Sequence, residues 1–237
     1  MGGSVKATDI MLIYNIRLSA SMPTLPLGVR LKKGIHRETA VAQDLMVVGT
    51  YEVYPDAVLH GGTAIWRCFG GNRFSEDLDL YLGPSKERGL GNLSDNLIRK
   101  GLTKLKSRQT ANAAFASFGL GRAIVRFKAS LRATREASVR PYETVDGNFM
   151  NVRTLGADSL LAEKALAYDS RRKAKDLYDV YFLLGPSDGT EKARRAVRDL
   201  LARFEKPVDE RSLRALVISG TAPTTADMLE ALTLWAR

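Results

Sequence analysis

The sequence is poor in the residues that form disulfides and bind zinc. It has one cysteine, Cys68, and two histidines, His36 and His60, among 237 residues. A single cysteine excludes an internal disulfide and is typical of a protein in a reducing cytoplasm. Neither histidine has a second potential ligand at the spacing of a zinc site, so we expect no zinc centre.

Long hydrophobic runs are absent as well. No stretch approaches the roughly 20 apolar residues that a membrane-spanning helix requires. Hydrophobic residues make up 45% of the chain and charged residues 26%, a composition typical of a soluble globular protein with a sizeable core. We therefore expect a cytoplasmic protein that has no membrane partner.

Acidic residues are scarce relative to basic ones. The chain has 36 Lys and Arg residues against 26 Asp and Glu residues, which gives a net charge of +10. This balance favours a polyanionic partner such as RNA, and a solvated basic surface is the alternative. The basic segment 192–206 has the same two interpretations, an exposed helix face or an extension of an RNA-binding surface.

Residues 57–82 contain the densest group of functional side chains. The segment begins with a short apolar strand, continues through a glycine pair into a short helix, and ends in a second strand with Asp77 and Asp79. Side chains two apart on a strand point to the same side, so the two carboxylates are expected to project together. Carboxylates placed side by side repel each other, and a divalent cation between them offsets the repulsion.

The glycine pair in the same segment suits a phosphate chain. Gly61 and Gly62 leave their backbone N–H groups approachable, the helix N-terminus follows at once, and Thr63 adds a hydroxyl donor. Arg73 and Ser75 have two interpretations: they contact a triphosphate, or they cap and pin the loop before the second strand. The segment therefore predicts a site for a nucleoside triphosphate and its metal.

A second group of candidate residues lies on two later helices. Lys164 falls in the middle of the apolar stripe of the helix predicted at 157–169, where an unpaired ammonium would be costly to bury. Asp176 falls within the apolar arc of the helix predicted at 174–184. Spacing alone favours a structural ion pair between Lys164 and Asp176 over a catalytic pair.

These motifs together resemble a known family. The signature of the polymerase-β-like nucleotidyltransferase superfamily resembles three segments here: 61–63 (Gly-Gly-Thr), 73–75 (Arg-Phe-Ser) and 77–79 (Asp-Leu-Asp). The motif formed by the second and third segments is most similar to that of the AbiEii/AbiGii toxins of type IV toxin–antitoxin systems. The family also has a lysine followed about twelve residues later by an aspartate, here Lys164 and Asp176. The resemblance extends from about residue 37 to about residue 185.

The resemblance implies a fold, an activity and partners. It implies an α+β fold with a mixed sheet packed by helices and a helical C-terminal part, divided as extension 1–36, nucleotidyltransferase module 37–155 and helical part 156–237. It implies transfer of a nucleotide from an NTP to RNA, with the 3′ end of tRNA as acceptor, by a toxin that has a cognate antitoxin. The alternatives are a nucleotidyltransferase acting on a protein or small molecule, and a non-catalytic nucleotide- or RNA-binding module.

The implied site residues follow from the same motifs. Asp77 and Asp79 are expected to bind Mg²⁺ or Mn²⁺, and the phosphate-binding set consists of Gly61, Gly62, Thr63, Arg73, Ser75 and Lys164. Lys164 would neutralise the triphosphate. Asp176 would orient Lys164, activate the attacking hydroxyl or complete the metal site.

The basic strand at 122–132 departs from the superfamily pattern. Its residues alternate between apolar and basic, so one side is expected to be buried. The superfamily usually has a third metal-binding carboxylate on such a strand, but the positions here include Arg126 and Lys128. These cations either line the active-site groove and bind RNA or form a solvated face. Glu143 and Asp146 are weak substitutes for the missing carboxylate.

Overall fold

The protein folds into a seven-stranded mixed sheet and two groups of helices. The computed structural model describes residues 25–83, 90–134 and 136–237. The elements of the sheet part are, in chain order, α2 (Leu27–Arg30), α3 (Gly34–Val53), β1 (Val58–His60), α4 (Gly61–Cys68), β2 (Asp77–Tyr81), α5 (Leu90–Arg99), β3 (Thr103–Gln109), β4 (Ala113–Leu120), β5 (Ala123–Ser130), β6 (Ala137–Glu143) and β7 (Phe149–Leu155). The strands lie in the order β3-β4-β5-β2-β1-β7-β6. Strand β2 pairs in parallel with β5, β1 pairs in parallel with β7, and the remaining pairs are antiparallel.

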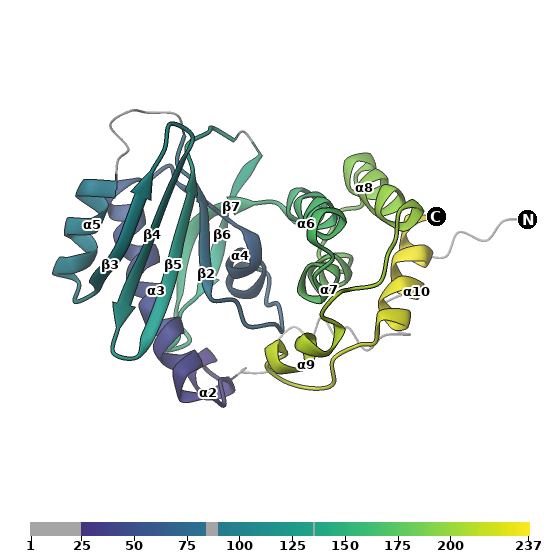
Figure 1. The fold of residues 1–237 in the computed structure, drawn as a ribbon, viewed down its shortest axis with the longest axis horizontal. Helices are drawn as coiled ribbons and strands as arrows, with labels where there is room; N and C mark the ends of the chain where they lie inside the picture. The colour runs from purple at the N-terminus through teal and green to yellow at the C-terminus, as the bar shows by residue number, and fades with distance from the viewer. Residues whose placement is uncertain (1–24, 84–89, 135) are drawn as a thin grey trace, which may run out of the picture.

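The C-terminal part is helical. It contains α6 (Ala157–Arg171), α7 (Ala174–Leu183), α8 (Glu191–Ala202), a short 3-10 turn at Glu210–Ser212, α9 (Leu213–Leu216) and α10 (Thr225–Ala236). Figure 1 shows the C-terminal helices α6, α7, α8 and α10 grouped together beside the sheet part. Within the sheet part, α3 and α4 contact each other through the ion pair between Asp44 and Arg67. The predicted α+β class with a mixed sheet and a helical C-terminal part is therefore confirmed.

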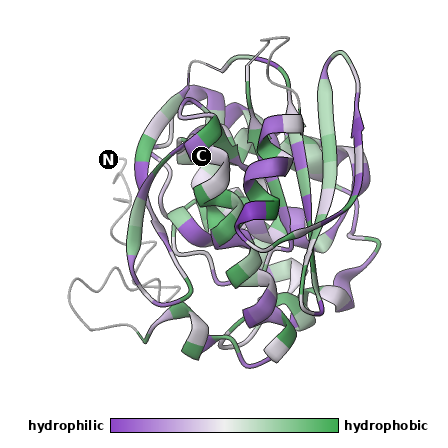
Figure 2. Ribbon diagram, turned by 90° about the vertical axis from the view of Figure 1, so that its left-hand side faces the viewer, coloured by the Kyte–Doolittle hydropathy of each residue, from purple (hydrophilic) through white to green (hydrophobic). Residues whose placement is uncertain are grey.

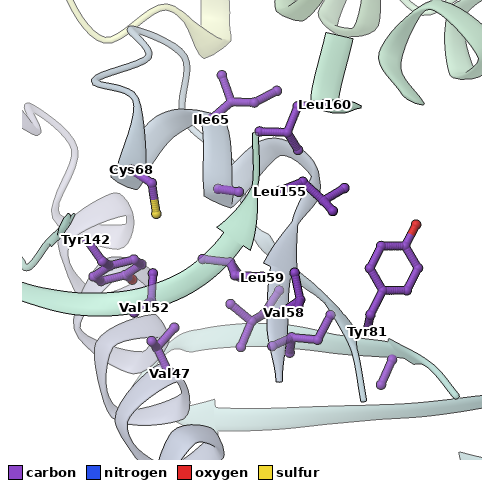
Figure 3. Packing of buried hydrophobic residues seen from close by; sticks show 14 of the residues in the cluster. Val47, Val58, Leu59, Ile65, Cys68, Tyr81, Tyr142, Val152, Leu155 and Leu160 are labelled. Atoms are coloured by element: carbon purple, nitrogen blue, oxygen red, sulfur yellow. The ribbon is translucent and has the colours of Figure 1, made fainter. Parts of the chain in front are cut away.

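One hydrophobic core connects the two parts. Leu59 and Leu78 of the sheet belong to the same buried cluster as Leu160 and Val180 of the C-terminal helices. Figure 3 shows part of this cluster where β7 leads into α6, with Ile65, Leu155 and Leu160. Hydrophobic and hydrophilic residues are interspersed along helices and strands alike (Figure 2), as expected for elements that bury one face. Within the described part of the chain, no helix combines the length and apolar character needed to cross a bilayer.

The helical spacing of Val41, Leu45 and Val48 predicts a helix at 37–54 that buries these three residues. The helix is present as α3, but of the three only Leu45 packs against the core. The expected positions Val41 and Val48 are exposed by 39% and 37%, whereas Met46 and Val47 are fully buried. The buried face also contains Gln43, whose side-chain amide donates to the Ser75 carbonyl at 2.8 Å. A hydrophobic pattern does not detect a buried polar residue of this kind. The apolar residues alone therefore predict the wrong buried face for α3.

The apolar spacing from Leu93 to Leu105 predicts one amphipathic helix over this stretch, which is longer than the helix in the structure, α5. It ends at Arg99 because Gly101 takes a left-handed conformation with φ of 93°, a frequent way for a helix to stop. Leu105 then lies on strand β3, where it is 48% exposed. By contrast, Pro141 and the Asp-Gly pair at 146 and 147 predict a hairpin at 139–152, and the antiparallel pairing of β6 with β7 confirms it.

The end of the segment predicted as an N-terminal extension, 1–36, packs against the rest of the structure. Residues 1–24 lie outside the described residues. Leu27 and Leu31 are each only 1% exposed and form a small second cluster with Trp66 and Phe74. At least the segment that carries these leucines is therefore part of the folded structure.

Candidate functional site

The two aspartates of β2 share one face, as their spacing predicts. Asp77 and Asp79 are partly exposed, whereas the intervening Leu78 and the following Leu80 are fully buried. Both aspartates line a cavity of about 310 Å³ between the sheet, the N-terminus of α4 and the helices α6 and α7. The predicted site residues that line this cavity are Gly61, Gly62, Arg73, Ser75, Asp77, Asp79, Arg126, Lys128 and Lys164.

The glycine pair allows α4 to begin directly against the carboxylates. Gly61 has a φ of 73°, and a Cβ atom at this position would lie 2.5 Å from Oδ2 of Asp79. A Cβ atom on Gly62 would lie 2.6 Å from the Ser75 hydroxyl and 2.7 Å from Arg73 Nη2. A side chain at either position would push against Asp79, Ser75 or Arg73, so the glycine pair keeps the N-terminus of α4 open to the cavity that both glycines line.

Thr63 does not take the role expected of it. Its side chain is fully buried, it does not line the cavity, and its hydroxyl donates to the backbone carbonyl of Asp77. Thr63 therefore ties α4 to β2. Ser75 is the better placed hydroxyl, because it lines the cavity and makes no side-chain hydrogen bond to another described residue.

Asp77 is held by the two cations of β5. Arg126 Nε lies 2.6 Å from Asp77 Oδ1, and the Lys128 ammonium bonds to Oδ2. Burial by itself raises the pKa of Asp77, but the hydrogen bonds from Lys128 and Arg126 outweigh it and bring the pKa below its usual value. Asp77 is therefore ionised at neutral pH.

Lysine stands opposite Asp79 on the neighbouring strand. The parallel register of β2 and β5 pairs Asp77 with Arg126 and Asp79 with Lys128. The weak substitutes named for the missing carboxylate are wrong: Glu143 bonds to Arg30, Asp146 bonds to Asn148, and neither lines the cavity. Strand β5 therefore places Arg126 and Lys128, and no carboxylate, next to the two aspartates.

Two aspartates bury the ammonium of Lys164. Its Nζ atom lies 2.7 Å from Asp179 Oδ2 and 3.6 Å from Asp176 Oδ1, and the side chain is 9% exposed. Asp176 receives two further hydrogen bonds from Arg171, at 2.6 and 2.7 Å, and does not line the cavity. This placement favours the positioning role of Asp176 over contact with the hydroxyl or the metal.

Asp179 was missed by the sequence analysis. It is 1% exposed and accepts two hydrogen bonds from Arg73, at 2.8 and 2.7 Å, besides the bond from Lys164. Burial opposes ionisation, but Arg73 and Lys164 outweigh it and lower the pKa of Asp179. Its place at the edge of the apolar arc of α7 was the available signal. The Arg73 contact with Asp179 pins the loop before β2, and Arg73 also borders the cavity.

Lys175 is a further cation that the sequence did not single out. It lines the cavity near the N-terminus of α7, and no carboxylate of the described residues lies within ion-pair distance of it. Burial lowers the pKa of Lys175, and the neighbouring positive charge of Arg73 lowers it further. Lys175 therefore differs from Lys164, Arg73 and Arg171, each of which already has a carboxylate partner.

A third group closes the end of the cavity at β1. His60 stacks on Tyr81 with ring centroids 4.1 Å apart, and its Nδ1 atom lies 3.1 Å from Glu163 Oε2. The Tyr81 hydroxyl donates to the other oxygen of Glu163, and burial with this bond raises the pKa of Tyr81 to about 12. These contacts connect β1 and β2 to α6.

The carboxylate pair fits magnesium that arrives with a substrate. Magnesium prefers oxygen ligands and is usually held by one or two carboxylates together with phosphate oxygens and water. Asp77 and Asp79 supply such oxygens on one face. Among the described residues, no group of three or more His, Cys, Asp or Glu side chains could hold a metal ion by itself. The donor set therefore suits a cation shared with a triphosphate.

Solved structures share this fold. JHP933 from Helicobacter pylori has 18% sequence identity and a TM-score of 0.61, with 86% of this chain and 91% of that chain covered. MenT4, a nucleotidyltransferase toxin from Mycobacterium tuberculosis H37Rv, has 18% identity and a TM-score of 0.60, with 89% and 86% covered. A search of curated proteins found no match.

A sequence family covers most of the chain. The family described as "Nucleotidyl transferase AbiEii toxin, Type IV TA system" matches residues 50–232. The match reaches through the C-terminal helices, further than the end near residue 185 expected from the motifs. The chain therefore belongs to the AbiEii nucleotidyltransferase toxins of type IV toxin–antitoxin systems, and it is a nucleotidyltransferase.

Proposed function

We propose that this protein transfers a nucleoside monophosphate from an NTP to an RNA acceptor, with the 3′ end of tRNA as the first candidate, in a reaction that requires Mg²⁺ or Mn²⁺. The observation that carries the proposal is the cavity that brings Asp77 and Asp79 together with the N-terminus of α4 and the cations of α6 and α7. Carboxylates, free N–H groups and ammonium groups in one cavity suit a metal-bound triphosphate.

The triphosphate is held at the helical end of the cavity. The N–H groups at the start of α4 and the Ser75 hydroxyl donate hydrogen bonds to phosphate oxygens. Lys175 supplies the ammonium that has no carboxylate partner among the described residues, and Lys164 lies beside it with its own charge largely balanced by Asp179. We assign Lys175 the larger share of phosphate binding, because binding there breaks no existing ion pair.

Asp77 and Asp79 hold the divalent cation. When bound, the cation polarises the phosphate oxygens and neutralises charge that develops during transfer. Binding of the divalent cation displaces part of the pairing of Asp77 with Lys128 and Arg126, which keep this carboxylate ionised at neutral pH. These two cations also reduce the negative charge that an RNA phosphate meets on its approach.

The transfer itself is an in-line displacement. The acceptor hydroxyl loses its proton to solvent water and attacks the α-phosphorus, a new oxygen–phosphorus bond forms, and the bond to the bridging oxygen of the pyrophosphate breaks. Lys164 and Lys175 stabilise the charge on the departing pyrophosphate. Asp176 and Asp179 position Lys164 and do not touch the reacting atoms.

Incubation with labelled nucleotides tests the proposal. Purified protein is incubated with each α-labelled NTP, Mg²⁺ and total tRNA, with Asp79→Ala and Asp95→Ala in parallel. Asp95 is an exposed carboxylate on α5, away from the cavity, and serves as the control. We expect label in tRNA with the wild type and with Asp95→Ala but not with Asp79→Ala. Label in protein or in a small molecule would overturn the RNA acceptor.

The cellular role follows from the family. We propose that the activity arrests growth in the cytoplasm and that a cognate antitoxin counteracts it. Induced expression of the wild type should stop growth, whereas Asp79→Ala expressed to the same level should not. If both proteins arrest growth equally, growth arrest does not depend on nucleotidyl transfer, and the proposed role is wrong.

A further inference from the structure

An open groove continues from the catalytic cavity across the sheet. It has a volume of about 500 Å³ and lies on β5, β4 and β3. We call it the sheet groove and define it by Lys106, Arg108, Phe115, Ser117, Arg126 and Lys128. Arg126 and Lys128 line both the cavity and the sheet groove, so the two spaces share a wall.

Strand pairing arranges these residues in two rows. In the first row, Asp77 is paired with Arg126, Arg126 with Ser117, and Ser117 with Lys106. Directly paired residues on neighbouring strands point to the same side of a sheet, so the whole row faces the groove.

The second row lies beside the first. Asp79 is paired with Lys128, Lys128 with Phe115, and Phe115 with Arg108. Each row crosses three strand spacings of about 4.8 Å, or about 14 Å in all. The groove therefore begins at the aspartates and ends at the edge strand.

The chemistry of the two rows matches single-stranded RNA. Phe115 is 44% exposed, which is unusual for a phenylalanine in the middle of a strand. Cations flank it on both neighbouring strands. Within the described residues, neither Lys106 nor Arg108 has a carboxylate within ion-pair distance, and the side chains of Arg126 and Lys128 are 58% and 40% exposed. An exposed aromatic ring between cations is the arrangement by which proteins stack a base and bind its flanking phosphates.

We propose that the sheet groove binds the single-stranded 3′ end of the RNA acceptor, with Phe115 stacking on a base and Lys106 and Arg108 contacting phosphates. The terminal hydroxyl then lies at the aspartate end of the rows. This inference rests on the proposed function in its choice of RNA as the acceptor. A protein partner is the other candidate occupant, because β3 is an exposed edge strand; charge and continuity with the cavity favour RNA.

Binding without catalysis tests the groove directly. The fluorescence anisotropy of a labelled 12-nucleotide single-stranded RNA is measured with the full-length protein at several salt concentrations and without NTP. We expect Phe115→Ala to weaken binding about tenfold and Phe115→Trp to retain it, because a larger ring still stacks. The double variant Lys106→Ala/Arg108→Ala should reduce the slope of log affinity against log salt by about 1.4, at about 0.7 for each phosphate contact.

Matched variants elsewhere on the surface serve as controls. Phe149 on β7 is 65% exposed, and Arg195 on α8 has a side chain that is 78% exposed. Phe149→Ala and Arg195→Ala should leave both the affinity and the salt slope unchanged. If they weaken binding as much as the groove variants do, the RNA does not lie in the sheet groove.

Steady-state transfer separates failure of the groove from failure of the proposed function. Phe115→Ala should raise the KM for RNA and leave the KM for NTP unchanged. If the groove variants label RNA with an unchanged KM for RNA, the proposal that the sheet groove binds the acceptor is overturned, and the proposed function stands. If the oligonucleotide binds with the expected effects of the variants but no label is transferred to RNA, the sheet groove is an RNA-binding site, and RNA as the acceptor is overturned. A wild type that does not bind the oligonucleotide would overturn the groove.

Discussion

Arg73, in the loop before β2, donates two hydrogen bonds to Asp179 of α7, at 2.8 and 2.7 Å, and both side chains are almost fully buried. Lys164 of α6 donates to the same carboxylate. Asp179 thus connects the segment leading into the strand of Asp77 and Asp79 to the two helices that carry Lys164 and Lys175. The shape of the cavity depends on this carboxylate.

Asp179→Asn is expected to destabilise the protein strongly. The substitution leaves Arg73 and Lys164 as buried cations with less compensation, and breaking a buried pair in this way costs about 3–5 kcal/mol. The free energy of unfolding in urea measures the loss. Asp199→Asn removes an exposed partner of Arg195 and should cost less than about 1 kcal/mol. A similar loss in both variants would contradict a structural role for the Arg73–Asp179 pair.

The same carboxylate predicts how stability depends on pH. Its pKa is lowered in the folded state, because Arg73 and Lys164 outweigh the effect of burial, whereas an unfolded aspartate titrates near 3.8. The contribution is therefore fully present above the unfolded pKa and is lost as the pH falls through the lower folded value. The difference in unfolding free energy between the wild type and Asp179→Asn should stay constant from about pH 7 to about pH 5 and shrink below about pH 4. A difference that grows on acidification would contradict this sign.

Local patterns were sufficient to predict much of the site. The alternation of Asp77 and Asp79 follows from the two-residue period of a strand, which needs no knowledge of the rest of the chain. The burial of Lys164 follows from its position in a helical stripe. The glycine pair indicated that another group comes close to the backbone at this point. The structure shows that these groups are the side chains of Asp79 and Ser75.

Features that depend on distant partners were not predictable from one sequence. The Thr63 hydroxyl bonds to the Asp77 carbonyl, and the Asp179 carboxylate bonds to Arg73, across more than one hundred residues in the second case. Strands β3 and β4 were missed because their sequences have few β-branched residues. Pairing with β4 determines the conformation of β3, and pairing with β5 together with burial of alternate residues determines that of β4. The rows of the sheet groove become visible only once the strand register is known.

Lys175→Ala is expected to weaken the binding of NTP. A hydrogen bond to a charged group contributes about 1.5–3 kcal/mol, so the KM for NTP should rise at least about tenfold with little change in the KM for RNA. Lys173→Ala is the matched control, because Lys173 lies two residues away, pairs with Asp209 at 3.6 Å and does not line the cavity. If both variants raise the KM for NTP equally, the effect comes from the loss of a positive charge in general, and the position of Lys175 in the cavity does not matter.

Gly61→Ala should abolish transfer through a steric effect on Asp79. The new Cβ atom would lie 2.5 Å from Oδ2 of Asp79, so the carboxylate must move away from its place beside Asp77. The backbone adds its own cost, because a left-handed conformation costs an L-residue about 1–2 kcal/mol. Gly70→Ala separates the two effects: Gly70 has a similar φ of 71°, and nothing lies within 4 Å of its added Cβ atom. Both variants should lose similar backbone stability in thermal unfolding, but only Gly61→Ala should lose labelling of the acceptor. If Gly70→Ala were equally inactive, backbone strain would account for the loss; if Gly61→Ala kept wild-type activity, the position of Asp79 against α4 would not be required for catalysis.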